Sequence, residues 1–167
     1  LLPLCGSVYV TGFESQTETG EPHAPSTSQP DNMQAFTWCF PMEYVDGRDF
    51  TIDKPPQYDF WKDYVPKLTP PWSGKLFSWT YSNPITLEPR TLAFDPKSEA
   101  DGWWKYRRIV DRANFTPGSF AGSVSLVNWP QNDYLLGNLC EVTPEEAARH
   151  REGGKQLSLS LLYWMQT

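Results

Sequence analysis

Hydrophobic and polar side chains alternate along several short stretches of the chain, and this period of two predicts β-strands. In residues 33–44, Phe36, Trp38 and Phe40 fall on one face of the predicted strand. Pro41 has no backbone N–H to donate, so we expect it at the end or the edge of a ladder. The same period predicts strands over residues 75–81, 91–94, 103–111 and 123–129.

A helical period of hydrophobic residues predicts one long helix, over residues 144–166. Thr143 and Glu146 form a capping box at its start, with proline at the first helical position. Gly153 and Gly154 lower the helix propensity of its middle by about 1 kcal/mol each. Either the helix bends at these glycines, or a neighbouring element packs too closely there for a side chain.

These elements predict an α+β domain in which the long helix packs against a mostly antiparallel sheet of three to five strands. A shorter helix is expected over residues 57–65, and residues 17–31 form a long loop by composition. The 167 residues suffice for one hydrophobic core, so residues 1–167 are expected to be a single domain or a fragment. Both ends are apolar and look like cuts through a longer polypeptide.

The charge balance narrows the range of functions. The chain has 20 acidic and 14 basic residues, a net charge of −6, and this argues against nucleic acid as a partner because phosphate binding needs a basic surface. It also argues weakly against an anionic membrane, and no apolar run approaches the roughly 20 residues that span a bilayer. Cys5, Cys39 and Cys140 do not suggest a disulfide framework. Reduced, partly buried thiols are expected, and with them a cytoplasmic location.

Arg107, Arg108, Asp111 and Arg112 concentrate charge on one predicted strand. Successive side chains of a strand point to opposite faces, so one of the two adjacent arginines is expected to face inward. That guanidinium needs a carboxylate, a carbonyl or a bound anion as its partner. Two interpretations stay open: a structural salt bridge to Asp111 or Asp133, or a clamp for a substrate carboxylate or phosphate.

A second polar cluster contains Asn128, Trp129, Asn132, Asp133 and Tyr134, around a turn that proline restricts. The amides and the carboxylate can order the turn through bonds to its own backbone. Alternatively, they face a ligand that lies beside the two aromatic rings. Asp133 is a candidate catalytic base only if burial raises its pKa.

Several common functional sites are missing from the sequence. His23 and His150 are the only histidines and lack the spacing of a metal site, and His150 is expected on a solvated helix face. There is no nucleophile elbow and no P-loop, and Gly6, Gly12 and Gly20 have the wrong spacing for a dinucleotide-binding fingerprint. The many aromatic residues form either a core or a platform for a sugar ring, and their strand-like alternation favours a core.

One block, Asn128-Trp129-Pro130-Gln131-Asn132-Asp133-Tyr134, is a fairly specific motif. Weaker motifs accompany it at residues 1–15, 33–37, 83–90, 106–112 and 155–164. In this order, and over nearly the whole chain, they resemble a family of bacterial FAD-dependent oxidoreductases.

The resemblance implies a two-domain flavoprotein in which a Rossmann-type domain holds FAD and an inserted, sheet-rich substrate domain covers the isoalloxazine. This chain resembles only the inserted (substrate or cap) domain and the start of the next helix, and it lacks the flavin-binding glycine motif. It would orient a small organic substrate for hydride transfer to FAD on another domain or chain, without redox activity of its own. The candidate substrate-binding residues are Arg107, Arg108, Asp111, Arg112, Asn128, Trp129, Asn132 and Tyr134, and Asp133 is the candidate catalytic base.

Two other functions stay open. The chain could be a stand-alone small-molecule or sugar-binding module without redox activity, which flavin-free ligand binding would support. It could also be a structural piece with no activity alone, whose apolar ends, residues 1–4 and 157–165, would then drive self-association.

Overall fold

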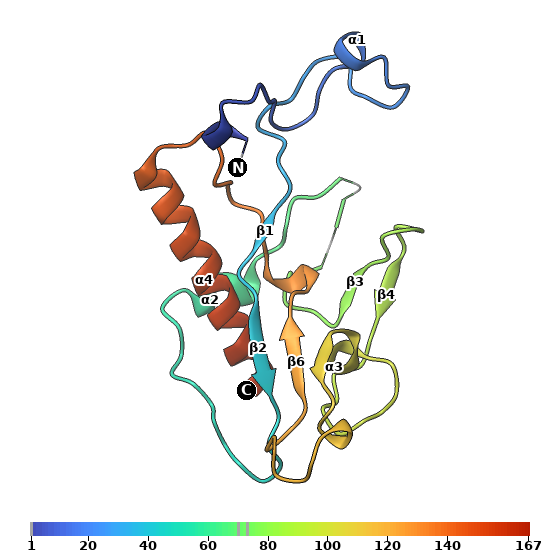
Figure 1. Cartoon of the computed structure of the whole chain (residues 1–167), viewed down its shortest axis with the longest axis vertical. Helices are drawn as coiled ribbons and strands as arrows, with labels where there is room; N and C mark the ends of the chain where they lie inside the picture. The colour runs from blue at the N-terminus through green and yellow to red at the C-terminus, as the bar shows by residue number, and fades with distance from the viewer. Residues whose placement is uncertain (1, 70, 73) are drawn as a thin grey trace.

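The protein is described by a computed structural model that covers residues 2–69, 71–72 and 74–167 (Figure 1), so Leu1 of the apolar start lies outside the described residues. Helices and antiparallel sheets are both present, which confirms the predicted α+β class. The strands are β1 (Phe36–Thr37), β2 (Phe40–Glu43), β3 (Thr80–Ser82), β4 (Pro89–Thr91), β5 (Arg108–Val110), β6 (Val124–Val127) and β7 (Asp133–Tyr134). They form a sheet of order β2-β6-β5 and the separate pairs β1-β7 and β3-β4, instead of the single sheet expected.

Helical elements lie between these strands. They are η1 (Pro3–Cys5), α1 (Gln16–Thr19), α2 (Tyr58–Asp63), α3 (Trp103–Tyr106), η2 (Arg112–Asn114), η3 (Pro130–Asn132) and α4 (Pro144–Gln166). The long helix α4 has the predicted bounds, and its capping box is present: Thr143 Oγ1 accepts a hydrogen bond from the Glu146 N–H at 3.2 Å. The short helix predicted over residues 57–65 is α2.

The long helix α4 supports most of the hydrophobic core. Leu157 and Leu161 on its inner face are fully buried. The elements packed against α4 are α2, η3 and β7, and Tyr58 of α2 meets Tyr163 of α4 edge-to-face with ring centroids 4.7 Å apart. The helix is therefore covered by a short helix, a turn and the β1-β7 pair rather than by a broad sheet face.

The two glycines of α4 lie where β1 and β7 approach the helix most closely. A Cβ on Gly153 would lie 2.6 Å from Tyr134 Oη, and a Cβ on Gly154 would lie 2.7 Å from Phe36 Cε2. The helix continues through both glycines without a break. Close packing, rather than a bend, is thus the reason why no side chain fits there.

The strand predicted over residues 33–44 is interrupted after β1. Between β1 and β2, the carbonyl of Trp38 accepts hydrogen bonds from Ser158 Oγ at 2.7 Å and from Asn132 Nδ2 at 3.2 Å. This carbonyl therefore bonds to side chains instead of a neighbouring strand, and the Trp38 side chain is 42% exposed. Pro41 lies in β2, an edge strand of its sheet, as its missing N–H predicts.

The prediction of a strand over residues 103–111 is wrong for the first half of this segment. Residues Trp103–Tyr106 form the helical turn α3, and only Arg108–Val110 are extended. A strand would point Trp103 and Trp104 to opposite faces, whereas the helical turn buries both, with 1% and 2% of their surfaces exposed. Burial of two adjacent indoles outweighs the alternating pattern here.

Two further strands are shifted from their predicted positions. The observed pair is β3, at Thr80–Ser82, and β4, at Pro89–Thr91, where strands over residues 75–81 and 91–94 were expected. Trp79 and Leu92, just outside this pair, still bond through the Leu92 N–H and the Trp79 carbonyl at 3.1 Å.

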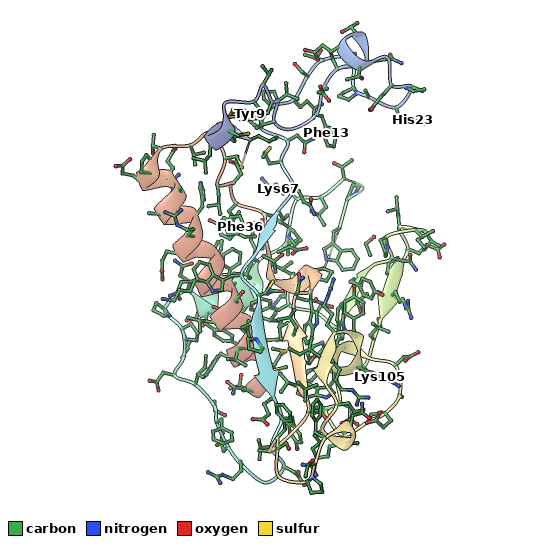
Figure 2. All side chains as sticks on the ribbon, viewed as in Figure 1. Tyr9, Phe13, His23, Phe36, Lys67 and Lys105 are labelled. Carbon is green, nitrogen blue, oxygen red and sulfur yellow. The ribbon has the colours of Figure 1, made fainter. Side chains whose placement is uncertain are left out.

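Residues 12–31 form an N-terminal arm that extends away from the rest of the molecule (Figure 1), whereas Thr11 Oγ1 still donates to Glu141 Oε2 at 3.1 Å, just before α4. The arm includes the segment predicted as a loop, and it contains the one-turn helix α1 and a bridge between Phe13 and Gln29. Figure 2 shows Phe13 and His23 on this arm, well separated from Phe36 near α4. His23 is exposed, so it does not belong to the core or to the cleft described below.

Two expectations from composition can be compared with the structure. Cys5, Cys39 and Cys140 are free and exposed, so the expected partial burial of the thiols is wrong. Among the described residues, the structure contains no helix whose length and apolar character would let it cross a bilayer.

Substitution of Gly154 by alanine tests the close packing of α4. Although alanine normally favours a helix by about 1 kcal/mol over glycine, we expect Gly154→Ala to lower the free energy of unfolding by about 1–3 kcal/mol because it overpacks Phe36. Urea denaturation measures the change. In a Phe36→Ala background the clash is removed, so the same substitution should no longer destabilise. A stabilising Gly154→Ala in the native background would contradict this packing.

Candidate functional site

A cleft of about 550 Å³ lies where the β1 segment, β3, α3 and the turn after β6 meet. Its lining includes Arg107, Asn128, Trp129 and Asp133, which come from both polar clusters of the sequence. Trp103 also lines the cleft. Trp103 and Trp129 are each only 1% exposed. The cleft therefore combines buried aromatic walls with a largely polar lining.

Arg107 supplies the positive charge of the cleft. It lies at the junction of α3 and β5, and its carbonyl accepts a bond from the Leu126 N–H at 2.9 Å, which ties this junction to β6. The exposed guanidinium lies over the Tyr106 ring, 5.2 Å from the centroid. Among the residues that the structure describes, Arg107 forms no ion pair. Its charge is therefore available to a ligand.

Arg108 has a different position, although it is adjacent in sequence. Its side chain is 13% exposed and binds Glu99 through Nη1 at 2.9 Å and Nη2 at 3.1 Å. Nη2 also lies 2.8 Å from Asp111 Oδ2, and the Arg108 guanidinium lowers the pKa of the Glu99 carboxyl. Of the two interpretations of the arginine pair, the structural salt bridge describes Arg108. Glu99 was not foreseen as a partner.

Arg112 and Asp111 also lie outside the lining of the cleft. Arg112 is exposed, and its Nη1 donates to the Ala121 carbonyl at 2.7 Å. The Asp111 side chain caps η2 by accepting a bond from the Ala113 N–H at 3.1 Å. Both residues thus have identifiable roles in the turn between β5 and β6.

Asn132 is the most deeply buried polar residue of the second cluster, with 0% of its surface exposed. Its Oδ1 accepts a bond from the Trp129 N–H at 2.9 Å, and its Nδ2 donates to the Trp38 carbonyl and to Ser158 Oγ. These are the backbone-ordering bonds that one interpretation of the sequence foresaw. Asn132 holds the turn in place and does not line the cleft.

Tyr134 also belongs to the core, where it is 5% exposed. Its ring packs on Phe36 with centroids 5.0 Å apart, and its hydroxyl hydrogen-bonds His150 Nδ1 at 3.1 Å. His150 is half-buried, so the expectation of a solvated face for it is wrong. Neither residue lines the cleft.

Asp133 occupies the position in the cleft where proton chemistry is possible. Burial raises the pKa of its carboxyl, and a hydrogen bond from the Thr37 hydroxyl partly opposes the shift. The two residues are directly paired across β1 and β7. The direction of the shift is the one that the sequence analysis required of a candidate base, because it makes the ionised carboxylate more basic.

The structure adds site residues that the sequence patterns did not indicate. Thr37 and Tyr106 line the cleft beside Asp133 and Arg107. Tyr106 is adjacent to the arginine pair and could have been considered with it. Thr37 belongs to the motif at residues 33–37, but nothing in the sequence linked it to Asp133, because the two residues meet only through the pairing of β1 with β7.

One buried polar atom of the cleft wall lacks a partner. The Trp129 Nε1–H is buried and has no hydrogen-bond acceptor among the described residues. Burial of an unpaired donor is unfavourable. Because the Nε1 atom is sealed from solvent, it is not presented to a ligand in the cleft.

The described residues do not fit the diphosphate of FAD. That group is usually held by free backbone N–H groups at a helix N-terminus after a glycine-rich turn. The N-terminus of α4 instead carries proline and the acidic residues Glu145 and Glu146 in its first turn, and its capping box uses N–H groups there. The other described helices have six residues or fewer, and no group of three potential metal ligands occurs in the described part of the chain.

The sequence model of one protein family, described as FAD dependent oxidoreductase, matches residues 1–167. The match spans every residue of the cleft. No match was found among curated proteins or among solved structures.

Asp133→Asn tests the burial of the carboxyl at the cleft. Because the pKa of Asp133 is raised in the folded chain, the protonated carboxyl favours the folded state over the unfolded state. This contribution to the free energy of unfolding is complete below the ordinary pKa of 3.8 and is lost as the pH rises through the folded-state pKa. The asparagine cannot titrate but still offers an oxygen to Thr37. The free energy of unfolding of the native chain, minus that of the variant, should fall as the pH rises above about 4 and then level off. Urea denaturation over a pH series measures it, and a rising difference would contradict the assignment.

Proposed function

Because the chain belongs to the family of FAD-dependent oxidoreductases, we propose that it supplies the substrate side of such an enzyme. A small organic substrate binds in the cleft and is oriented there for hydride transfer to flavin. FAD is held by another domain or chain, since the described residues offer no cradle for its diphosphate. The observation that carries this proposal is that Arg107, which forms no ion pair with any described residue, lines one cleft with Asn128, Trp129 and Asp133.

Arg107 is the proposed anchor for an anionic group of the substrate. A guanidinium binds a carboxylate or phosphate through parallel hydrogen bonds, which also restrict the orientation of the ligand. The Asn128 amide adds a hydrogen-bonding group to the same lining. A substrate with an acid group and a second oxygen or nitrogen would satisfy these contacts.

Asp133 is the proposed proton acceptor. Removal of a hydride from the C–H of an alcohol or amine also requires loss of the O–H or N–H proton, and a carboxylate with a raised pKa accepts it more readily. The Thr37 hydroxyl holds the carboxylate at the edge of the cleft. Asp133 would then have a catalytic role, and Thr37 would position it.

The proposed partner is a flavin-binding domain or chain, and the proposed compartment is the reducing cytoplasm, which the three free, exposed thiols support. A stand-alone binding module is the second candidate, because a cleft of about 550 Å³ has the size of a small-molecule site without any flavin. A sugar platform is less well supported, since Trp103 and Trp129 are only 1% exposed and act as core residues.

Arg107→Gln is expected to weaken binding of small carboxylates about tenfold or more, because it removes a charge-assisted hydrogen bond. Arg112→Gln is the matched control: it removes an exposed arginine of the same segment that does not line the cleft. Calorimetric titration with a panel of small acids measures both. Equal affinities for the two variants would refute the anchor role of Arg107.

Mixing the chain with a flavin-binding domain of the same family separates the two candidate functions. The substrate-side proposal predicts a stable complex with visible flavin absorption, in which Asp133→Asn reduces the rate of flavin reduction more strongly than it weakens substrate binding. Gel filtration and single-turnover absorption measure these properties. Ligand binding by the chain alone, with no complex, would favour the module instead.

A further inference from the structure

A groove of about 380 Å³ continues from the cleft on the side of β4. Tyr81, Leu92 and Tyr106 line both the groove and the cleft, so the two spaces share one wall. The groove is also lined by Arg90 of β4 and by Lys105 of α3 (Figure 2), neither of which lines the cleft. A ligand that fills the cleft and continues past the shared wall enters the groove, and the proposed function does not yet use it.

Arg90 and Lys105 give the groove two positive charges. Neither residue forms an ion pair with any described residue. The Lys105 ammonium donates to the Glu99 backbone carbonyl at 2.7 Å, and this neutral partner leaves the charge of the ammonium uncompensated. The Glu99 carboxylate is itself bound by Arg108 at 2.9 Å. Both cations of the groove therefore keep a charge that an acid group can neutralise.

The balance of charges along the lining favours an anion in the groove. Among the described residues of the groove lining, Asp101 is the one carboxylate, against Arg90 and Lys105. In the cleft, Asp133 stands against Arg107. As far as the structure describes it, the continuous lining thus carries one more cation than carboxylates, on a chain whose net charge is −6. Electrostatic attraction for an anion is strongest where cations outnumber carboxylates, which is in the groove.

The backbone that carries the two cations is ordered by contacts within the chain. The Trp103 N–H donates to the Ala93 carbonyl at 2.9 Å, which joins α3 to the segment after β4. Gly102 lines the groove and permits this approach, because a Cβ there would lie 2.6 Å from the Ala93 carbonyl oxygen. Arg90 is paired with Tyr81 across β3 and β4. A backbone that is ordered before binding lowers the entropic cost of capturing a ligand.

From these observations we infer that the substrate of the proposed site is an elongated dicarboxylic acid. One carboxylate binds Arg107 in the cleft, and this part of the inference rests on the proposed function. The second carboxylate binds Arg90 and Lys105 in the groove. The carbon atoms between the two groups run along Leu92 and Tyr106 of the shared wall. Guanidinium and ammonium groups both form charge-assisted hydrogen bonds to a carboxylate, so the two groove cations determine specificity for the second acid group.

Straight-chain dicarboxylates and their monomethyl esters provide matched probes, because each ester has the carbon chain of its diacid but only one negative charge. The probes run from malonate through glutarate to suberate, so that the spacing of the two acid groups varies. Calorimetric titration of the full chain should show that at least one diacid binds about tenfold or more tightly than its own ester, as expected for one additional charge-assisted contact.

Variants of the cations assign each acid group to its partner. Arg90→Gln and Lys105→Gln should each weaken the preferred diacid about tenfold and leave the affinity for its ester nearly unchanged. Arg107→Gln should weaken both ligands. Arg112→Gln is the matched control, because Arg112 lies in neither lining, and it should change neither affinity. Arg90 and Lys105 are exposed, so their variants are expected to fold, and circular dichroism checks this.

Two results would overturn the inference and leave the proposed function intact. One is equal affinity of the native chain for every diacid and its ester, with binding that still depends on Arg107. The other is a preference for a diacid that neither Arg90→Gln nor Lys105→Gln reduces. Failure of the proposed function gives a different result. If no probe bound at millimolar concentration, or if Arg107→Gln changed neither affinity, the anchor role of Arg107 would be refuted together with the inference.

Discussion

The buried amide of Asn132 is the contact on which the position of the cleft depends. It binds the Trp129 N–H within its own turn, the Trp38 carbonyl between β1 and β2, and Ser158 on α4. In a buried setting each of these bonds is costly to lose, because its partner would remain unpaired. One side chain therefore holds a turn, a strand break and the long helix in a single arrangement. Asn128 and Trp129 line the cleft from this turn.

The close approach of α4 to β1 and β7 is the second constraint. Phe36 and Tyr134 occupy the space that side chains on Gly153 and Gly154 would need. The same short ladder continues to the Thr37 and Asp133 pair at the edge of the cleft. The partial burial that raises the pKa of Asp133 therefore depends on helix packing as well as on the residues around the carboxyl.

The polar residues divide between support and chemistry. Among the arginines, Arg108 is neutralised by Glu99 and Asp111, whereas Arg107 forms no ion pair with any described residue. In the turn, the Asn132 side chain hydrogen-bonds the backbone, whereas the Asp133 side chain lines the cleft. This division agrees with a substrate-orienting role, because a charged anchor binds best when the groups around it are already fixed.

Local signals in the sequence determined the long helix, the α+β class and the two polar clusters. The capping box and hydrophobic period of α4 lie within the helix itself, so its bounds could be predicted without any tertiary contact. Only the tertiary structure decided that Trp103 and Trp104 form a helical turn, because four residues carry too little periodicity to separate a helix from a strand. It also decided which arginine is bound by carboxylates and which residue meets Asp133. Both outcomes depend on pairings between segments far apart along the chain, and no local pattern encodes them.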